Sequence, residues 1–331
     1  MIDLTICISV HNTAEYLPRC LDSIFSQEEL NCEIILVNNG STDNSEEIMW
    51  KYHEKFPNIK VIRQEDRGLA QGRQTGINNA SGEYIAFLDA DDYVFNNIYP
   101  KALKYAKEYS LDIVEFCTMR GEKVLKSPFE GICKCHDILK EYFWGKKTIY
   151  PMMWLRIYKR SLFDIPVLPS IYVNNEDIFA YPCLLYNGNT IGFISDIGHN
   201  YSLDNSSAVM IQLRKDKAFT EKYYENRRKT LLCIDHIENY IGTGNLQIEF
   251  AREFNQYKQR VMVTYLFSDV FGVSVSSLKD DLVAQFGFDS KFQLMKYIRK
   301  NTENNSDVNR MIKYFGFPVA YWIHRIRKAS R

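Results

Sequence analysis

The sequence predicts an α/β fold of three layers, in which a mainly parallel sheet lies between helices and is followed by a helical C-terminal extension. Two observations predict this class. Over the first ninety residues, short runs rich in β-branched residues alternate with segments of helical periodicity at intervals of roughly 25 residues, as in successive βαβ units. From about Ser206 onward the strand signals fade and the pattern is helical.

The first ninety residues carry the clearest pattern. Residues 16–25 form an apolar stripe of helical spacing, and Asn12 with Glu15 ahead of it has the spacing of a capping box. A second helix is expected over residues 45–55, after a turn rich in Asn, Gly and Ser. The four strands are expected at residues 4–10, 33–37, 59–63 and 84–88.

Beyond residue 92 the alternation loosens. Helices are expected over 97–109 and from near Asp177 onward, and strands over residues 112–117, 154–158 and 190–195. We place a domain boundary near residue 205, which gives a domain at 1–205 and a mainly helical region at 206–331.

Composition excludes several classes of protein. Apolar residues make up 46% and charged residues 25% of the 331, which is typical of a globular chain. Lys+Arg and Asp+Glu both number 41, so the basic excess of a nucleic-acid-binding protein is missing. The eight cysteines are scattered, which favours reduced thiols. We expect neither a signal peptide nor a membrane span, and hence a cytoplasmic protein.

Three aspartates follow the fourth expected strand, within Phe87-Leu-Asp-Ala-Asp-Asp-Tyr93. Ligands of open parallel sheets bind at the carboxyl ends of strands. Carboxylates bunched there repel one another unless a cation lies among them, and Mg²⁺ or Mn²⁺ prefers such oxygen ligands. The alternative is a surface turn with helix-capping aspartates, and a DxD pattern alone does not exclude it.

Five segments together resemble the family-2 glycosyltransferases of the GT-A fold. The resemblance runs through about residues 1–205, in the family's order and spacing. It implies a donor-binding half at about 1–95 and an acceptor half at about 96–205. The segments are Ile8-Ser-Val-His-Asn12, Val37-Asn-Asn-Gly-Ser-Thr-Asp43, Gly68-Leu-Ala-Gln-Gly-Arg73, Ala80-Ser-Gly-Glu-Tyr-Ile-Ala-Phe-Leu-Asp-Ala-Asp-Asp92 and Asn175-Glu-Asp177.

The resemblance implies a site for a nucleotide-diphosphate sugar. Ser9, His11 and Asn39 would surround the base, with the His11 ring stacking on it. The family more often has Tyr at position 11 and Asp at positions 38 and 39, yet a UDP-sugar is still favoured. Donor-binding residues further along the chain would be Arg73, Asp89 and Ala90, although Arg73 could instead be a solvated helix arginine.

The catalytic base implied by the resemblance is Asp177, which would take the proton of the acceptor hydroxyl in an inverting transfer. Glu176 would orient Asp177 or touch the acceptor. The alternative for both acids is helix capping, because acids favour the first turn of a helix. Asp91 and Asp89 would hold Mn²⁺ or Mg²⁺, and His199 is a candidate third ligand.

Other residues carry less specific signals. Trp154 and Arg156 lie where relatives line the acceptor side, but a core aromatic beside a surface arginine explains them equally well. Residues 310–331 mix aromatic and basic residues, which suits peripheral contact with a membrane or packing on protein. A homo-oligomer is left open.

Three functions are compatible with these patterns. The first is an inverting glycosyltransferase acting on a glycan or lipid-linked acceptor, which the resemblance implies. The second is a non-catalytic relative that serves as a binding or assembly module, and the departure at Asn38 and Asn39 permits it. The third is a sugar-nucleotidyltransferase, which the lack of glycine and lysine in Val10-His-Asn-Thr-Ala-Glu15 disfavours. The sequence identifies neither the sugar nor the acceptor.

Overall fold

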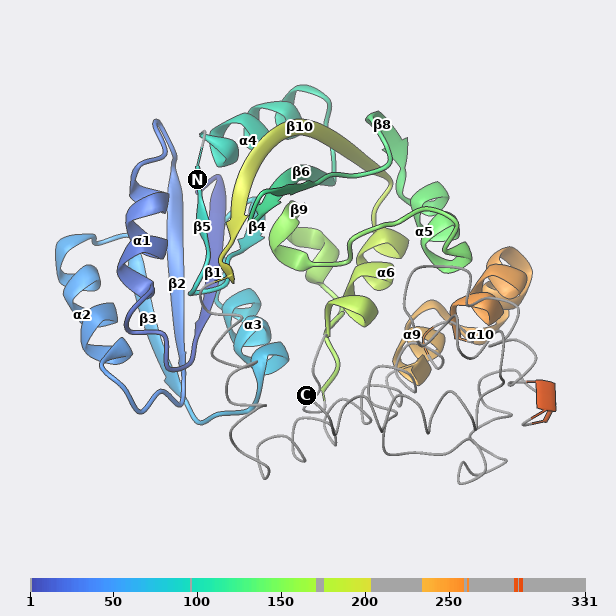
Figure 1. The fold of residues 1–331 in the computed structure, drawn as a ribbon, viewed down its shortest axis with the longest axis horizontal. Coiled ribbons are helices and arrows are strands. Elements are labelled where there is room, and N and C mark those ends of the chain that lie inside the picture. The colour runs from blue at the N-terminus through green and yellow to red at the C-terminus, as the bar shows by residue number, and fades with distance from the viewer. Residues whose placement is uncertain are drawn as a thin grey trace, which may run out of the picture. The chain divides into compact units, whose positions relative to one another are not determined.

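The computed structural model of the chain describes residues 2–95, 97–170, 176–203, 234–258, 261, 289–290 and 292–293 (Figure 1). The chain divides into two compact units, Met1–Leu246 and Gln247–Arg331. The predicted boundary at residue 205 and the tail at 310–331 both lie outside the described residues. In the second unit, residues 251–258 are helical.

The N-terminal half of the sheet is parallel, as the sequence predicts. Strand β1 pairs with β2 on one side and β4 on the other, and β2 pairs with β3. Ser9 on β1 lies opposite Val37 on β2, so the ends of these strands are level with each other. The strands are β1 (Leu4–Val10), β2 (Cys32–Asn39), β3 (Ile59–Gln64) and β4 (Tyr84–Phe87).

The rest of the sheet is mixed, in the order β3-β2-β1-β4-β9-β6-β10-β5. Strand β9 runs antiparallel to both of its neighbours, β4 and β6, while β6 and β10 are parallel. Two short strands, β7 and β8, extend β6 and β10 at their sides. The bounds are β5 (Tyr93–Val94), β6 (Ile113–Arg120), β7 (Lys123–Leu125), β8 (Gly131–Lys134), β9 (Arg156–Lys159) and β10 (Thr190–Tyr201).

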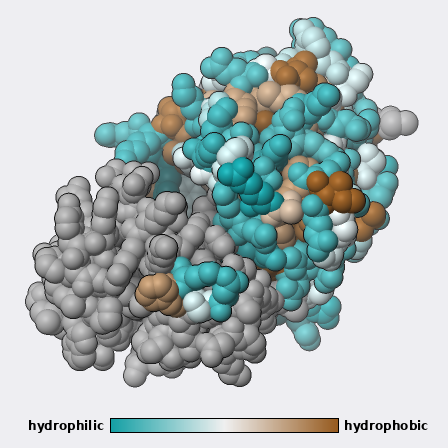
Figure 2. Space-filling model, turned by 90° about the vertical axis from the view of Figure 1, so that its right-hand side faces the viewer, coloured by the Kyte–Doolittle hydropathy of each residue, from teal (hydrophilic) through white to brown (hydrophobic). Residues whose placement is uncertain are grey.

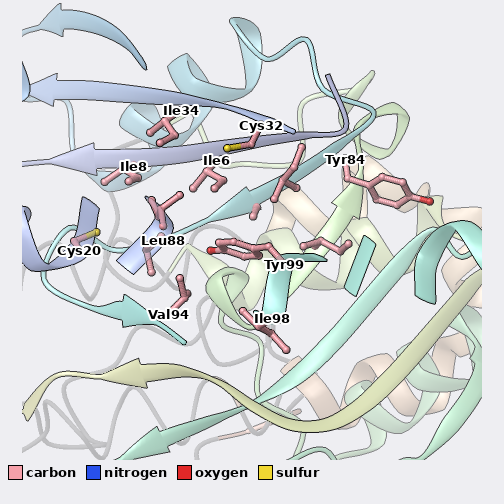
Figure 3. Packing of buried hydrophobic residues seen from close by; sticks show 14 of the residues in the cluster. Ile6, Ile8, Cys20, Cys32, Ile34, Tyr84, Leu88, Val94, Ile98 and Tyr99 are labelled. Atoms are coloured by element: carbon pink, nitrogen blue, oxygen red, sulfur yellow. The ribbon is translucent and has the colours of Figure 1, made fainter. Parts of the chain in front are cut away.

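Helices cover both faces of the sheet and make it the middle of three layers (Figure 1). Apolar residues of α1, α2 and α4 join one face of β1, β2 and β4 in a single core, part of which Figure 3 shows. Helix α3 covers the other face of β1 and β2. The bounds are α1 (Leu17–Phe25), α2 (Ser45–Lys55), α3 (Leu69–Asn78), α4 (Ile98–Glu108), α5 (Cys135–Trp144), α6 (Asp177–Asn187), α9 (Ile234–Ile241) and α10 (Thr243–Asn245).

The predicted start of α1 was wrong. The helix begins at Leu17 with Pro18 in its first turn, and no side chain caps it. Asn12 has a positive φ of 52° and uses its Oδ1 to accept hydrogen bonds from the backbone N–H groups of Thr42 and Asp43. Asn12 therefore ties the loop after β1 to the turn after β2, and Thr13 supplies the carbonyl that starts the first turn.

Hydrophilic residues dominate the drawn face of the surface, and most of the described cysteines are buried. On the face drawn in Figure 2, apolar residues are scattered among hydrophilic ones. Within the described ranges, no helix has both the length and the apolar character needed to span a membrane. The seven cysteines of the described part are all free, and six of them are buried.

Candidate active site

Arg73 on α3 lies at the centre of the candidate site. Its guanidinium donates to Oδ1 of Asp177 over 2.7 Å and to Oδ1 of Asp89 over 2.8 Å, and it also pairs with Glu176. The Arg73 side chain is only 3% exposed, so the alternative of a solvated helix arginine is excluded. One cation thus joins the DxD segment after β4 to the two acids at the start of α6.

Two glycines let α3 lie close enough to the sheet to place Arg73 there. A Cβ added to Gly72 would lie 2.2 Å from Oγ of Ser9, and one added to Gly76 would lie 2.9 Å from Sγ of Cys7. Both positions face β1, one helical turn apart. Gly72 therefore sets the height of the helix above Ser9, and the next residue along the helix is Arg73.

Burial and mutual repulsion perturb the two acids at the start of α6. Burial raises the pKa of Glu176 to about 7; the cation of Arg73 opposes this shift, and Asp177 adds to it. Burial also raises the pKa of Asp177, against the opposing effect of Arg73. Asp177 is 16% exposed, whereas Glu176 is 2% exposed. Of the two acids, Asp177 is therefore the one with access to a substrate, and a raised pKa suits proton transfer near neutral pH.

The DxD turn is fixed from beneath and from the side. The backbone N–H of Asp92 donates to the Asp89 carbonyl over 3.0 Å, which closes the turn around buried Ala90. Arg19 on α1 donates to the Asp91 carbonyl over 3.1 Å and to Oγ of Ser202 over 2.8 Å. These contacts hold the backbone of Asp89, Ala90 and Asp91 in one conformation.

His199 is fully buried and faces Asp92. Oγ1 of Thr118 donates to the His199 carbonyl, so it accepts from Nδ1–H of the ring over 2.8 Å, and Nε2 keeps its lone pair. Nε2 lies 3.3 Å from Oδ2 of Asp92, and neither atom has a hydrogen-bond partner among the described residues. Burial lowers the pKa of His199 to about 3 and raises that of Asp92 to about 8.

The residues predicted for the base lie together at the ends of β1 and β2. The exposed His11 ring donates from Nδ1 to the Asn39 carbonyl over 2.9 Å, which leaves the faces of the ring to other contacts. The Asn39 side chain is buried, and its hydrogen-bonding capacity is used within the protein. Its Nδ2 donates to Asp66 and to the Gly68 carbonyl, and its Oδ1 accepts from Gln64 and the Arg67 backbone.

Neighbouring acids explain why amides occupy positions 38 and 39. Nδ2 of Asn38 donates to Oε2 of Glu46 over 3.0 Å, and Nδ2 of Asn39 donates to Oδ1 of Asp66 over 3.3 Å. An aspartate at either position would set two carboxylates against each other at the same distance. The departure from the family pattern is therefore compensated locally and is compatible with an intact site.

Trp154 and Arg156 belong to the interior, so the surface-arginine interpretation was wrong. Trp154 stacks on His199 with ring centroids 4.1 Å apart. Arg156 is fully buried, donates to Glu115 over 2.7 Å, and lies 4.0 Å from the ring centre of Tyr181 on α6. Its other two guanidinium nitrogens donate to the backbone carbonyls of residues 150 and 152.

The residues present fit a divalent cation that takes part of its coordination shell from a ligand. No group of three or more His, Cys, Asp or Glu in the described part is arranged as a complete metal site. Asp89 and Asp91 offer carboxylate oxygens, and the unsatisfied buried pair of Nε2 on His199 and Oδ2 on Asp92 lies beside the same turn. Remaining ligands would be phosphate oxygens or water, as Mg²⁺ commonly has.

Sequence reasoning missed two residues that organise the site. Arg19 carries no motif, and its role follows only from the packing of α1 beside the DxD turn. Asp66 lies two residues before Gly68, at the edge of a segment that the resemblance includes, so its position in the chain was a usable signal. Its carboxylate fixes the loop before α3 by accepting from Gly68 N–H over 2.9 Å.

Comparison with known proteins finds relatives among the glycosyltransferases. Residues 5–165 match the family model described as glycosyl transferase family 2. GlyA, a glycosyltransferase of Streptococcus pneumoniae serotype 4, is 43% identical over 33% of this chain and 16% of its own length. YibD, an uncharacterized glycosyltransferase of Escherichia coli K12, is 26% identical over 78% of each chain.

Two solved structures share the fold. The crystal structure of S. aureus TarS 1-349 has a TM-score of 0.63 at 18% identity, covering 100% of this chain and 92% of that one. TarS 1-349 is also known in complex with UDP-GlcNAc. The mannosyltransferase PcManGT from Pyrobaculum calidifontis, in complex with GDP-Man and Mn²⁺, has a TM-score of 0.50 at 14% identity, covering 91% of this chain and 88% of that one.

The mixed sheet, with a DxD turn after β4 and an acid pair joined to it through Arg73, has the GT-A fold of the solved neighbours. Residues 5–165, a little under half of the chain, resemble the glycosyl transferase family 2 model.

Proposed function

We propose that this protein is an inverting glycosyltransferase that moves a sugar from a UDP-sugar to a hydroxyl of a glycan or lipid-linked acceptor. The observation that carries the proposal is the bridge through Arg73, because it brings Asp89 of the DxD segment and Asp177 of α6 onto one guanidinium. Acids from the donor-binding and acceptor halves can therefore act on one sugar.

Asp177 acts as the general base. Its partly exposed carboxylate accepts the proton of the acceptor hydroxyl while the oxygen forms its bond to the anomeric carbon and the bond to the diphosphate breaks. Attack from the side opposite the leaving group inverts the anomeric centre. Arg73 and the N–H of Met153 donate to Asp177 and hold it in place. Glu176, more deeply buried on the same guanidinium, orients this arrangement.

Asp91 and Asp89 would hold Mn²⁺ or Mg²⁺, and His199 would be a further ligand. When bound, the ion supplies positive charge that stabilises the departing diphosphate. The DxD turn is suited to this role because Arg19 fixes its backbone and the Asp92 N–H closes it. The complex of PcManGT with GDP-Man and Mn²⁺ supports a metal in this fold.

The donor binds at the ends of β1 and β2, where Ser9 and the exposed His11 ring lie. The TarS complex with UDP-GlcNAc supports a UDP-sugar, whereas the PcManGT complex contains GDP-Man. Thermal shift with UDP, GDP and CMP, each with and without Mn²⁺, tests this step, because a ligand of the native state raises the melting temperature. A rise with UDP that depends on Mn²⁺ is expected; no rise with any nucleotide would refute the proposal.

Released UDP, measured with UDP-sugars and no added acceptor, then separates an enzyme from an inactive binding module. Slow hydrolysis that requires Mn²⁺ is the expected result, because water can replace the acceptor hydroxyl at Asp177. A protein that binds UDP with Mn²⁺ but hydrolyses none of a panel of UDP-sugars would instead be the binding module.

A further inference from the structure

We infer that Asp66 is the residue that reads the nucleotide base, and that it selects uracil through the N3–H group. The inference rests on the proposed function, since it assigns a specificity-determining residue within the proposed donor site. The acid that relatives more often carry at the end of β2 is here an amide, Asn39, and the loop between β3 and α3 supplies a carboxylate, Asp66, that contacts this amide.

The position of Asp66 follows from two contacts. Asn39 donates to its Oδ1 over 3.3 Å, and a Cβ added to Gly40 would lie only 2.7 Å from its backbone nitrogen. The Asn39 carbonyl in turn accepts from the His11 ring. Asp66 therefore lies at the end of β2, where Asn39 contacts both Asp66 and the His11 ring, and it is exposed.

Asn39 cannot provide this recognition with its side chain. Both of its N–H donors and its carbonyl oxygen are engaged by the loop at residues 64–68. Its side chain is 3% exposed. The Asn39 amide instead orients Asp66, because Asn39 Nδ2 and the Gly68 N–H both donate to Oδ1 of Asp66. No described residue donates to the other oxygen, Oδ2, so Asp66 presents one free acceptor at the surface.

One free carboxylate oxygen discriminates between bases. Uracil offers a single N3–H donor on its pairing edge, which one acceptor satisfies. Cytosine has a lone pair at N3, which a carboxylate repels. Guanine offers adjacent N1–H and N2–H donors, which call for two acceptor oxygens, and here Oδ1 is already occupied. The structure therefore favours UDP over CDP and GDP.

The experiment measures Kd for UDP, CDP and GDP by calorimetry in the presence of Mn²⁺. For Asp66→Asn we expect UDP to bind at least ~10-fold more weakly, with the preference over CDP reduced, because an amide no longer presents the same charged acceptor. Glu65→Gln is the matched control, since it removes an equal charge from the neighbouring exposed residue, and it should leave Kd nearly unchanged.

Exchanging the two residues tests whether misfolding, and not loss of base recognition, weakens UDP binding in Asp66→Asn. Asn39→Asp alone should lower the melting temperature, because its carboxylate would face Asp66. The double variant Asn39→Asp with Asp66→Asn should recover that loss and regain UDP binding relative to Asp66→Asn alone. Unchanged UDP affinity and base preference in Asp66→Asn would overturn the inference. Failure of the unmodified protein to bind any of the three nucleotides would instead refute the proposed function.

Discussion

A single arginine sets the charge balance of the candidate site. Arg73 contacts three carboxylates, so full ionisation leaves two uncompensated negative charges around a buried cation. Asp177, Glu176 and Asp89 raise the pKa of Arg73 despite its desolvation. Burial raises the pKa of Glu176 and Asp177, and the charge of Arg73 offsets part of that rise. Such an excess of negative charge is consistent with the proposed binding of a divalent cation at this site.

This balance predicts the pH dependence of donor hydrolysis. A base acts when ionised, so activity should rise as the pH rises through the pKa of Asp177, which burial raises above its ordinary value. Arg73→Met removes the charge that opposes the shift, so the acidic limb of kcat/KM should move to higher pH. Arg67→Met, an exposed arginine before α3, is the control. An unchanged limb in Arg73→Met would contradict the electrostatic account.

The sequence identified the acids but not how Arg73 is surrounded. The end of the fourth strand indicated Asp89 and Asp91, the resemblance indicated Asp177, and the structure brings Asp89 and Asp177 to one guanidinium. Whether Arg73 is solvated depends on how closely α3 approaches β1, which is a tertiary property. Local sequence likewise does not reveal the environment of Asn39. Its side chain forms hydrogen bonds with a loop that lies 25 to 29 residues further along the chain.

The helix α3 depends on small residues to place its arginine. Gly72→Ala puts a methyl group 2.2 Å from Oγ of Ser9, so the helix has to move off β1. We expect overpacking to cost about 1–3 kcal/mol of unfolding free energy and UDP hydrolysis to fall, because Arg73 moves with the helix. Gln74→Ala, which lies on the same helix away from Ser9, provides the control in chemical denaturation. Equal stability of Gly72→Ala and the unmodified protein would show that the close approach is unimportant.

The accuracy of the predicted elements followed the strength of their patterns. The strand at residues 4–10 and the helix at 45–55 have the predicted bounds, because β-branched runs and cap residues mark them. Strands β7 and β8 were missed, since three or four residues show no periodicity. Helix α5 was also missed, although its buried Ile138, Leu139, Tyr142 and Phe143 have helical spacing. The antiparallel course of β9 depends on chain reversal, which local pattern does not reveal.

The first compact unit is longer than the domain expected from sequence. Helix α9 belongs to it, with Ile234 and Ile237 fully buried. His236 donates to the Val167 carbonyl over 2.8 Å, and Asn187 at the end of α6 donates to the Tyr240 hydroxyl over 2.6 Å. The helix that carries Asp177 is thus supported by residues that follow the predicted boundary at 205.

A pair of truncations tests that support. A chain of residues 1–246 retains α9 on α6, whereas a chain of residues 1–205 exposes the apolar surface that α9 covers. We expect 1–205 to melt at a lower temperature and to aggregate more readily than 1–246, because burying each large apolar side chain contributes about 1.5–3 kcal/mol. Circular dichroism melts measure the difference. Equal melting temperatures would place the end of the domain near residue 205 after all.

The bridge from the DxD turn to α6 is tested most directly by comparing turnover with UDP binding in Asp177→Asn. UDP release from the productive UDP-sugar should fall at least ~100-fold, because the base is lost, while Kd for UDP with Mn²⁺ stays within a few-fold of the unmodified protein. Near-normal turnover in Asp177→Asn would contradict the central claim and remove Asp177 from the role of base.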